Sequence, residues 1–236
     1  MLGDRPMIKR LAAWILLAVT LPLAACAIKP MTDEERARQI ITSAELTYEK
    51  FLASQDRPME RFRQLLPRAE GIVILPGVVK GGFIVGAEGG NGVLLAKDAS
   101  GAWGQPAFYL MAAGSVGLQA GAQVGDMILL VFSRDAVGSI ITHQGKLSAD
   151  LGLTIGTVGA GVEAATTTNI GADVLAFTQG IGVFAGGALE AAALIRRSDL
   201  NTAFYGQPVT PADIVLHGSV RNPAADGLRG SLAGQR

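Results

Sequence analysis

The stretch that most constrains the fold runs from Pro106 to Phe132, because it is the longest segment of the chain with a clear period. Between Gly114 and Gly125 that period is two, since apolar side chains alternate with glycine, serine and glutamine. This alternation places apolar side chains on one face of a β-strand and small or polar ones on the other. We therefore expect a strand from Gly114 to Gly125, a break at Asp126 and a second strand from Met127 to Phe132. The alternating apolar residues are Val116, Leu118, Ala120, Ala122 and Val124.

By hydropathy alone the same segment also fits a membrane-spanning helix, because it is long, apolar and carries one charge. Its glycines Gly117, Gly121 and Gly125 have the four-residue spacing of a helix-packing motif. A helix exposed to lipid has no reason for strict alternation, nor for Gln119 and Gln123 in its interior. We therefore favour the strand and keep the membrane helix as the alternative.

Composition indicates one folded domain behind an N-terminal leader. The 236 residues are 49% hydrophobic and 17% charged, which is enough to bury one sizeable core. The formal net charge is zero, from 20 basic and 20 acidic residues. Removing the leader takes away three basic residues and one acidic residue, which leaves 17 basic, 19 acidic and a net charge of −2. This balance gives no reason to expect nucleic acid as a partner.

The N-terminus has the layout of an export signal. From Met7, two basic residues precede an apolar core, Leu11 to Leu23, which is too short to span a bilayer comfortably. The core ends in Leu23-Ala24-Ala25-Cys26, which resembles the lipobox of bacterial lipoproteins. The resemblance implies that the sulfur of Cys26 is diacylated and that Cys26 becomes the new N-terminus. Cys26 is the only cysteine, so an exported chain has no partner for a disulfide within itself.

Ordinary signal cleavage near Ala25 is the alternative to lipidation, and either Met1 or Met7 fits as the start. Ala27 rather than aspartate follows the cysteine. By resemblance to sorting rules in enteric bacteria, this favours the outer membrane, facing the periplasm of a bacterial envelope. We expect four regions: a lipoprotein signal peptide (1–26), a tether (27–31), the folded domain (32–220) and a flexible C-terminal tail (221–236).

Two helices are expected after the tether. Thr32 and Glu35 have the spacing of a capping box, and apolar residues then recur every three or four positions to about Ser54. A second, shorter helix is expected from Pro58 to Leu66, with an arginine-bearing face. We favour packing of that helix on a sheet over the alternative, an amphipathic helix lying on a membrane. The apolar positions of the first helix are Ala37, Ile41, Ala44, Tyr48 and Phe51, and the arginines of the second are Arg57, Arg61 and Arg63.

Short apolar runs separated by turn residues follow from Gly71 to Gly206. The Asn91-Gly92 pair within Glu88–Gly92 is typical of a hairpin turn. This order favours an antiparallel sheet over alternating βαβ units. The predicted class is α+β, mainly an antiparallel sheet or partly closed barrel, with N-terminal helices and short C-terminal helices. Strands are expected at Gly71–Leu75, Gly82–Gly86, Val93–Lys97, Lys146–Ile155, Ala172–Phe177 and, weakly, Gly182–Ile195, with a helix at Arg134–His143.

Sequence motifs for catalysis are missing. His143 and His217 are far apart, and no serine has the G-x-S-x-G spacing of a nucleophile elbow. The glycines before Lys146 do not make a phosphate-binding loop. Carboxylates such as Asp150 and Glu163 show no metal-ligand spacing. We therefore expect no enzyme activity, no cofactor and no metal.

Three blocks of sequence resemble the SYLF domain, a lipid-binding domain of bacterial lipoproteins and of yeast actin-patch proteins. The resemblance covers roughly Leu46 to Val215. Its most specific parts are Lys80-Gly81-Gly82-Phe83 and Arg196-Arg197 with Asn201 and Phe204-Tyr205-Gly206. It implies binding of phospholipid head groups without reaction chemistry. The blocks are AEGIVILPGVVKGGFIVGAEGGNGVLLAK, GKLSADLGLTIGTVGAGVEA and GIGVFAGGALEAAALIRRSDLNTAFYG.

The resemblance implies a head-group site at Lys80, Gly81, Gly82, Arg196 and Arg197. Arginine can hold a phosphate through two hydrogen bonds, and glycine lets backbone amides approach an anion. The alternative is that the two arginines pair with local acids such as Glu190 or Asp199.

The expected function is therefore that of a lipid-anchored envelope protein that binds anionic phospholipid. Two alternatives remain open. One is a structural or partner-binding envelope lipoprotein whose protein partner the sequence does not identify. The other is an envelope hydrolase with an unrecognised site.

Overall fold

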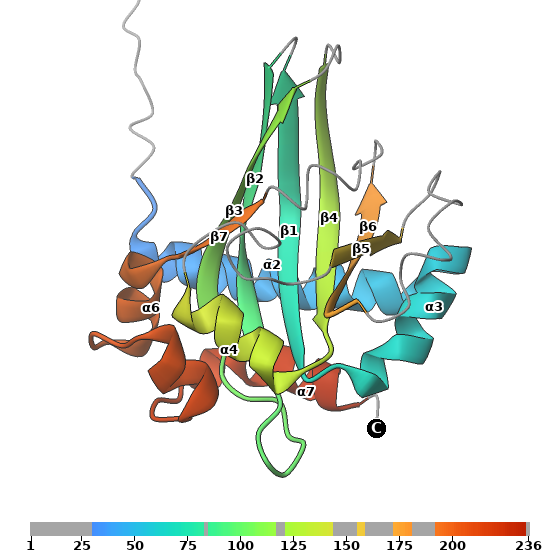
Figure 1. Cartoon of the computed structure of the whole chain (residues 1–236). Helices are drawn as coiled ribbons and strands as arrows, with labels where there is room; N and C mark the ends of the chain where they lie inside the picture. The colour runs from blue at the N-terminus through green and yellow to red at the C-terminus, as the bar shows by residue number, and fades with distance from the viewer. Residues whose placement is uncertain are drawn as a thin grey trace, which may run out of the picture. The chain divides into compact units, whose positions relative to one another are not determined.

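A seven-stranded sheet with the strand order β5-β6-β4-β1-β2-β3-β7 is the centre of the fold (Figure 1). The computed structural model describes residues 30–82, 85–116, 121–143, 155–158, 172–180 and 192–234. All neighbouring strands are antiparallel except β5 and β6, which are parallel. The strands are β1 Gly71–Gly82, β2 Val85–Ala96, β3 Ala107–Val116, β4 Gly121–Val131, β5 Ile155–Val158, β6 Val174–Gly180 and β7 Ala193–Arg196.

Helices cover both faces of the sheet. Helix α2, Asp33–Ala53, lies against one face, and α4, Arg134–Thr142, lies against the other (Figure 1). The described strands form an open sheet, so the α+β class is confirmed and the sheet is not closed into a barrel. The shorter helical elements are α3 Arg57–Leu65, η1 Leu66–Arg68, α6 Ser198–Tyr205, the π-helical turn η3 Ala212–Leu216, η4 Pro223–Ala225 and α7 Asp226–Ala233.

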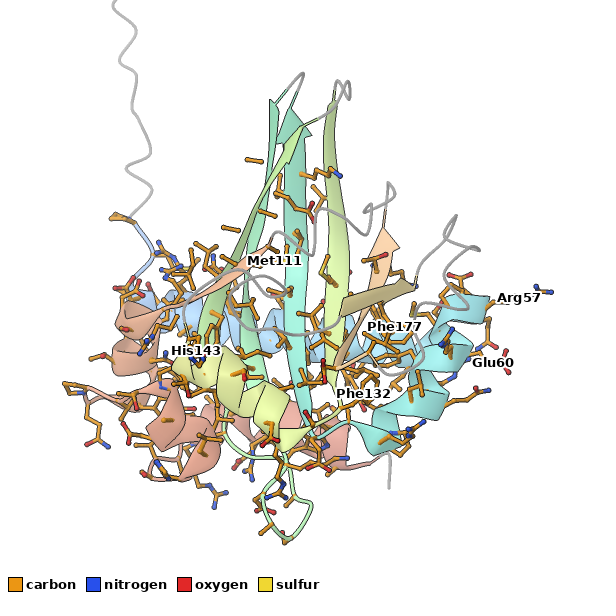
Figure 2. The ribbon with its side chains drawn as sticks, in the orientation of Figure 1. Arg57, Glu60, Met111, Phe132, His143 and Phe177 are labelled. Carbon is orange, nitrogen blue, oxygen red and sulfur yellow. The ribbon has the colours of Figure 1, made fainter. Side chains whose placement is uncertain are left out.

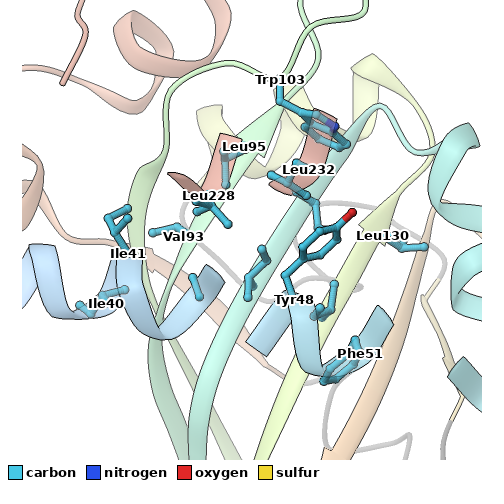
Figure 3. Packing of buried hydrophobic residues seen from close by; sticks show 14 of the residues in the cluster. Ile40, Ile41, Tyr48, Phe51, Val93, Leu95, Trp103, Leu130, Leu228 and Leu232 are labelled. Atoms are coloured by element: carbon cyan, nitrogen blue, oxygen red, sulfur yellow. The ribbon is translucent and has the colours of Figure 1, made fainter. Parts of the chain in front are cut away.

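The predicted first helix is confirmed as α2, and all five of its predicted apolar positions are buried. They join the core on one face of the sheet, together with residues of β1, β2 and β4 (Figure 3). Phe62 of α3 is the aromatic centre of this core. Its ring lies 5.7 Å from that of Phe51 and 5.4 Å from that of Phe177 in β6. These edge-on contacts connect the two N-terminal helices to the sheet.

Helix α3 buries its apolar side, as the favoured sequence interpretation predicts. Met59 and Phe62 are buried, and Leu66 is buried in η1. Arg63 donates hydrogen bonds to the carbonyl oxygens of Leu52 and Ser54, at 3.1 and 2.6 Å. The helix therefore packs against the sheet with Arg57 on the outside and Arg63 bonded to the end of α2.

The predicted turn at Glu88–Gly92 is wrong, because β2 runs straight through it. Strand β1 continues past the predicted end at Leu75 to Gly82, with a register shift near Pro76. The strand predicted at Gly82–Gly86 covers the end of β1 and the start of β2, and its residues 83–84 lie outside the described residues. Gly92 lies opposite Tyr109 in β3, and a side chain there would overlap the carbonyl oxygen of Ile74 in β1. The glycine thus serves a close approach of two strands. Pairing of β2 on both sides outweighs the local turn preference of Asn-Gly.

The predicted single strand from Gly114 to Gly125 is also wrong. Strand β3 ends within it and β4 begins within it, while residues 117–120 lie outside the described residues. Asp126, predicted as a break, lies inside β4. Its carboxylate accepts hydrogen bonds from Gly77 N at 2.9 Å and Lys50 Nζ at 2.7 Å. In the described chain, no helix has the length and apolar character to cross a bilayer.

The remaining predicted elements are placed as follows. The helix expected from Arg134 is confirmed as α4, and the strand expected at Ala172–Phe177 is observed as β6. The strand expected at Lys146–Ile155 falls outside the described residues except for Ile155, which begins β5. The signal peptide, Cys26 and the first part of the expected Gly182–Ile195 strand also lie outside them.

The predicted flexible tail is wrong for most of its length, because residues 223–233 form η4 and α7. Leu228 and Leu232 are buried in the same core as α2 (Figure 3). Arg229 Nε donates to the carbonyl oxygens of Trp103 and Gly104, at 3.0 and 3.1 Å. The short, glycine-containing helix has a weak local signal, so only its contacts reveal it.

We expect Leu228→Ala to lower the free energy of unfolding by about 2–5 kcal/mol, because it leaves a cavity beneath α2. Leu216→Ala is the matched control, since Leu216 is 50% exposed, and its effect should stay within about 0.5 kcal/mol. Urea unfolding followed by circular dichroism measures both. Equal stabilities of the Leu228→Ala variant and the wild type would show that α7 does not pack in solution.

Gly92→Ala should destabilise the sheet by about 3 kcal/mol or more, because the new methyl group meets backbone of β1. Gly114→Ala adds the same methyl group in β3 with no atom within 4 Å, so its stability should be unchanged or raised by up to about 1 kcal/mol. Thermal unfolding of the two variants provides the comparison. Similar melting temperatures would contradict the close approach of β1 and β2.

Candidate functional site

The three residues of the first implied lipid-binding block lie near the end of β1. Lys80 stands opposite Glu88 in β2, and both are largely buried, with 8% and 5% of their surface exposed. Within the described ranges, Oε2 of Glu88 has no hydrogen-bond partner. Burial raises the pKa of the Glu88 carboxyl above its ordinary value, and the charge of Lys80 opposes that shift. Lys80 is therefore part of a buried, oppositely charged pair.

Gly81 and Gly82 are paired with β2 on one side and β4 on the other. A strand with partners on both sides uses its amide groups in the sheet ladder. The backbone amides of these glycines are thus engaged within the fold, which removes the physical reason for expecting them to hold an anion. Whether they contribute to binding in another way stays a prediction of the resemblance.

The second block lies around the start of α6. Arg196 ends β7 opposite Tyr109 of β3, and its charge acts on the Tyr109 hydroxyl. Arg197 forms an ion pair with Asp199 at 2.6 Å and donates to Asn91 Oδ1 at 2.5 Å. The hydrogen bond from Arg197 lowers the pKa of Asp199. Pairing with Asp199 is the alternative that the sequence left open, and the hydrogen bond to Asn91 joins the start of α6 to β2.

The sheet separates these residues. Lys80 has the same orientation as Val78, whose side chain belongs to the core beneath α4. Arg196 lies on that face too, because it stands opposite Tyr109 in the same core. Arg197 reaches Asn91, which faces α2. The described structure therefore does not bring the five implied residues together in one site.

Asn201 and Phe204-Tyr205-Gly206, the most specific part of the resemblance, have structural roles. Asn201 is fully buried, and its Oδ1 accepts a hydrogen bond from Phe108 N at 2.9 Å. Phe204 packs edge-on against Phe108 with ring centres 5.1 Å apart. The Tyr205 hydroxyl donates to the carbonyl oxygen of Pro106 at 2.7 Å, and burial raises its pKa. Gly206 ends α6 with a φ of 70°, which glycine adopts without strain.

A groove of about 650 Å³ lies on the opposite face from Lys80, between α2 and the strands β1, β2 and β4. Two apolar side chains that line it are exposed, Leu46 by 61% and Val79 by 49%, and Val124 beside the groove is exposed by 53%. Val79 and Val124 are direct cross-strand neighbours. Other lining residues are Gln39, Ile40, Ser43, Thr47, Pro76 and Asn91.

The charged groups in the groove are already paired. Arg36 forms an ion pair with Asp33 at 3.5 Å, and Asp126 pairs with Lys50 at 2.7 Å. The groove therefore offers a ligand an apolar rim and neutral hydrogen-bonding groups. The sequence analysis missed this groove, although Leu46 on the polar side of the predicted helix is a signal that could have indicated it.

Groups suited to catalysis do not gather in the described part of the chain. No cluster of three or more histidine, cysteine, aspartate or glutamate side chains there could hold a metal ion. His143 and His217 are both exposed.

Comparison with known proteins identifies relatives across most of the chain. The sequence model of the Ysc84 family, described as "Las17-binding protein actin regulator", matches residues 112–234. LAS seventeen-binding protein 3 of Saccharomyces cerevisiae is 31% identical over 201 residues, covering 82% of this chain and 42% of the relative. The yeast protein YSC84 is 31% identical over 205 residues, covering 84% and 42%.

A human relative, SH3 domain-containing YSC84-like protein 1, is 30% identical over 166 residues, covering 70% of this chain and 48% of that protein. The chain thus spans less than half the length of these curated relatives. The match to the family model covers more than half of the 236 residues and includes α4, β6, β7 and the C-terminal helices. The chain therefore belongs to the Ysc84 family, the SYLF-domain family that its motifs resemble.

Proposed function

We propose that this chain is a lipid-anchored protein of the bacterial envelope whose SYLF domain binds the head groups of anionic phospholipids and catalyses no reaction. The spacing between Cys26 and α2 carries the proposal. Helix α2 begins at Asp33, so only six residues separate it from the lipobox cysteine. Six extended residues span about 20 Å. A domain anchored at Cys26 is thereby held close to the bilayer, most naturally the outer membrane facing the periplasm.

Such proximity makes weak contacts effective. A short flexible linker gives an effective concentration in the millimolar range, so head-group contacts of modest affinity would be populated. The acyl chains would supply the attachment, at about 0.8 kcal/mol per buried methylene. The domain itself then needs only to choose among lipids or to orient on the surface. The names of the relatives as binding and regulatory proteins agree with a function without catalysis.

The five residues implied by the resemblance remain candidates for the head-group site. Lys80 and Arg197 would have to exchange existing interactions, with Glu88 and with Asp199 and Asn91, for contacts with phosphate. Arg196 also has an interaction within the fold. Their present partners favour structural roles, so a loss of binding in their variants is meaningful only where folding is intact.

A second candidate function is binding of a protein segment in the groove beside α2. The exposed Leu46, Val79 and Val124 favour it, because contiguous exposed apolar side chains mark interaction surfaces. The yeast relative is named for binding another protein. A photo-crosslinking residue in place of Val124 tests this candidate in cells. Adducts to one protein would support it, and adducts to lipid would support the first proposal.

We expect Cys26→Ser to leave the precursor unprocessed, because the acylated sulfur is the substrate feature that the lipobox implies. The matched control is Ser43→Ala, a change of a hydroxyl group in the folded domain that leaves the signal intact. Mass spectrometry of the purified N-terminus and labelling with palmitate provide the measurement. An unmodified cysteine in the wild type, or label in the Cys26→Ser chain, would refute the lipid anchor.

A protein of residues 27–236 should float together with vesicles of phosphatidylglycerol. With vesicles of phosphatidylcholine alone it should stay at the bottom of the gradient. The reason is that anionic lipids attract basic side chains by about 1 kcal/mol each near the surface. Density-gradient flotation measures the bound fraction. Equal behaviour with both vesicles, at low and at moderate salt, would reject head-group binding and favour the protein-binding candidate.

A further inference from the structure

The outer side of α3 and η1 carries three arginines that have no partner among the described residues. In the part of the chain that the structure describes, Arg57, Arg61 and Arg68 form no ion pair or hydrogen bond with their side chains. Every other described arginine has one. Guanidinium groups without protein partners keep all five donors available to a ligand. This contrast singles out the three residues from the other surface cations.

The three arginines lie in one row. Arg57, Arg61, Gln64 and Arg68 are separated by four, three and four residues, the spacing that puts side chains on the same side of a helix. The row extends for roughly 16 Å along the axis. Figure 2 shows Arg57 pointing away from the sheet, and Met59 and Phe62 hold the opposite side of the helix in the core. We call Arg57, Arg61 and Arg68 the arginine row.

The charge around the row is positive. The segment Arg57–Arg68 contains four arginines and one acidic residue, Glu60, a net charge of +3. Lys97 lies beside it, since its Nζ donates to the carbonyl oxygen of Pro67 at 2.9 Å. Glu70, the next acid along the chain, is already paired with Arg134 at 3.2 Å. Asp56, which directly precedes α3, and Glu60 are the acids next to the row, so the segment from Asp56 to Arg68 still has a net charge of +2.

Helix α2 has the opposite balance, with five acidic and three basic residues and a net charge of −2. Two of its cations, Arg36 and Arg38, are paired within the helix. The charge of the N-terminal helices is thus segregated: α2 is acidic and α3 with η1 is basic. An anionic surface would be repelled by the first and attracted by the second.

We infer that the arginine row is the surface by which the domain contacts an anionic bilayer, through phosphate groups of the lipid head groups. The inference rests on the proposed lipid-binding function and places its contact away from Lys80, Arg196 and Arg197. Arginine suits this ligand because its planar fork gives two parallel hydrogen bonds to phosphate oxygens. The row needs no rearrangement of the fold to make these bonds.

The position of the row adds a second contact to the anchor. Helix α2 is 21 residues long, about 30 Å, and α3 follows its C-terminal end, whereas the tether joins its N-terminal end. An anchor at one end and a basic row at the other would fix how the domain lies on the membrane. A lipid anchor combined with basic residues is a known physical route to stable attachment.

The test compares two double variants of residues 27–236 in flotation with phosphatidylglycerol vesicles. Arg57→Gln with Arg61→Gln should weaken vesicle binding about 30-fold, because two contacts of about 1 kcal/mol each are lost. The matched control is Arg38→Gln with Arg221→Gln, which removes the same charge from exposed arginines that are paired with Glu34 and Asp226. The control should bind within about threefold of the wild type.

Three further measurements make the outcome decisive. Circular dichroism must show both variants folded, as expected because none of the four arginines is buried. Arg57→Lys with Arg61→Lys should retain most of the binding, and wild-type binding should fall between about 0.01 M and 0.15 M salt as the Debye length shortens from about 30 to about 8 Å. Equal losses of vesicle binding in the two glutamine variants would overturn the role of the arginine row. Unchanged binding by a folded Arg57→Gln/Arg61→Gln variant would do the same. Either result would leave the lipid-binding function of the domain standing. Failure of the wild type to bind would overturn both.

Discussion

Burial of the first half of β1 on both faces is the constraint on which the rest of the structure depends. Ile72, Val73, Ile74 and Leu75 are all fully buried, and they point alternately into the two cores. A sheet with apolar side chains on both faces needs a layer on each. Helix α2 supplies one layer and α4 the other (Figure 1). The C-terminal helix α7 is ordered for the same reason, because its leucines complete the core beneath α2.

The second half of β1 obeys different rules. Glycines and small residues replace the large apolar ones there, and the strands β1 to β4 extend beyond the helices (Figure 1). Lys80 and Glu88 are buried together on one face, and Val79 and Val124 are exposed on the other. The half of the sheet that the helices cover is therefore tightly packed, and the half that extends beyond them carries few large side chains. The groove lies at this transition, where α2 still covers the strands but large side chains no longer fill the space.

Pairing decides which charges shape the fold and which are available to partners. Lys50 and Asp126 join α2 to β4, and Arg197 joins α6 to β2. These side chains already have partners within the molecule, and binding a ligand would break those contacts. The arginines on the outer side of α3 have no such role. A protein that meets a membrane without catalysis needs little more than cations left unpaired on a rigid element, together with an anchor that keeps them close.

Elements with a local signal could be predicted from the residues alone. The apolar residues of α2 recur along one helix face, so Ala37, Tyr48 and Phe51 could be assigned to the core in advance, as could the α+β class and the family. How distant segments meet depends on the packing of the whole chain. Asn91-Gly92 has the local signature of a turn but is held extended by pairing with Leu110 and Tyr109 of β3, at a register shift in the pairing with β1. Arg197 finds Asn91, 106 residues away, and Lys50 finds Asp126, 76 residues away. Such partners are chosen by strand order and register, which depend on packing of the whole sheet and leave no periodic trace along the chain.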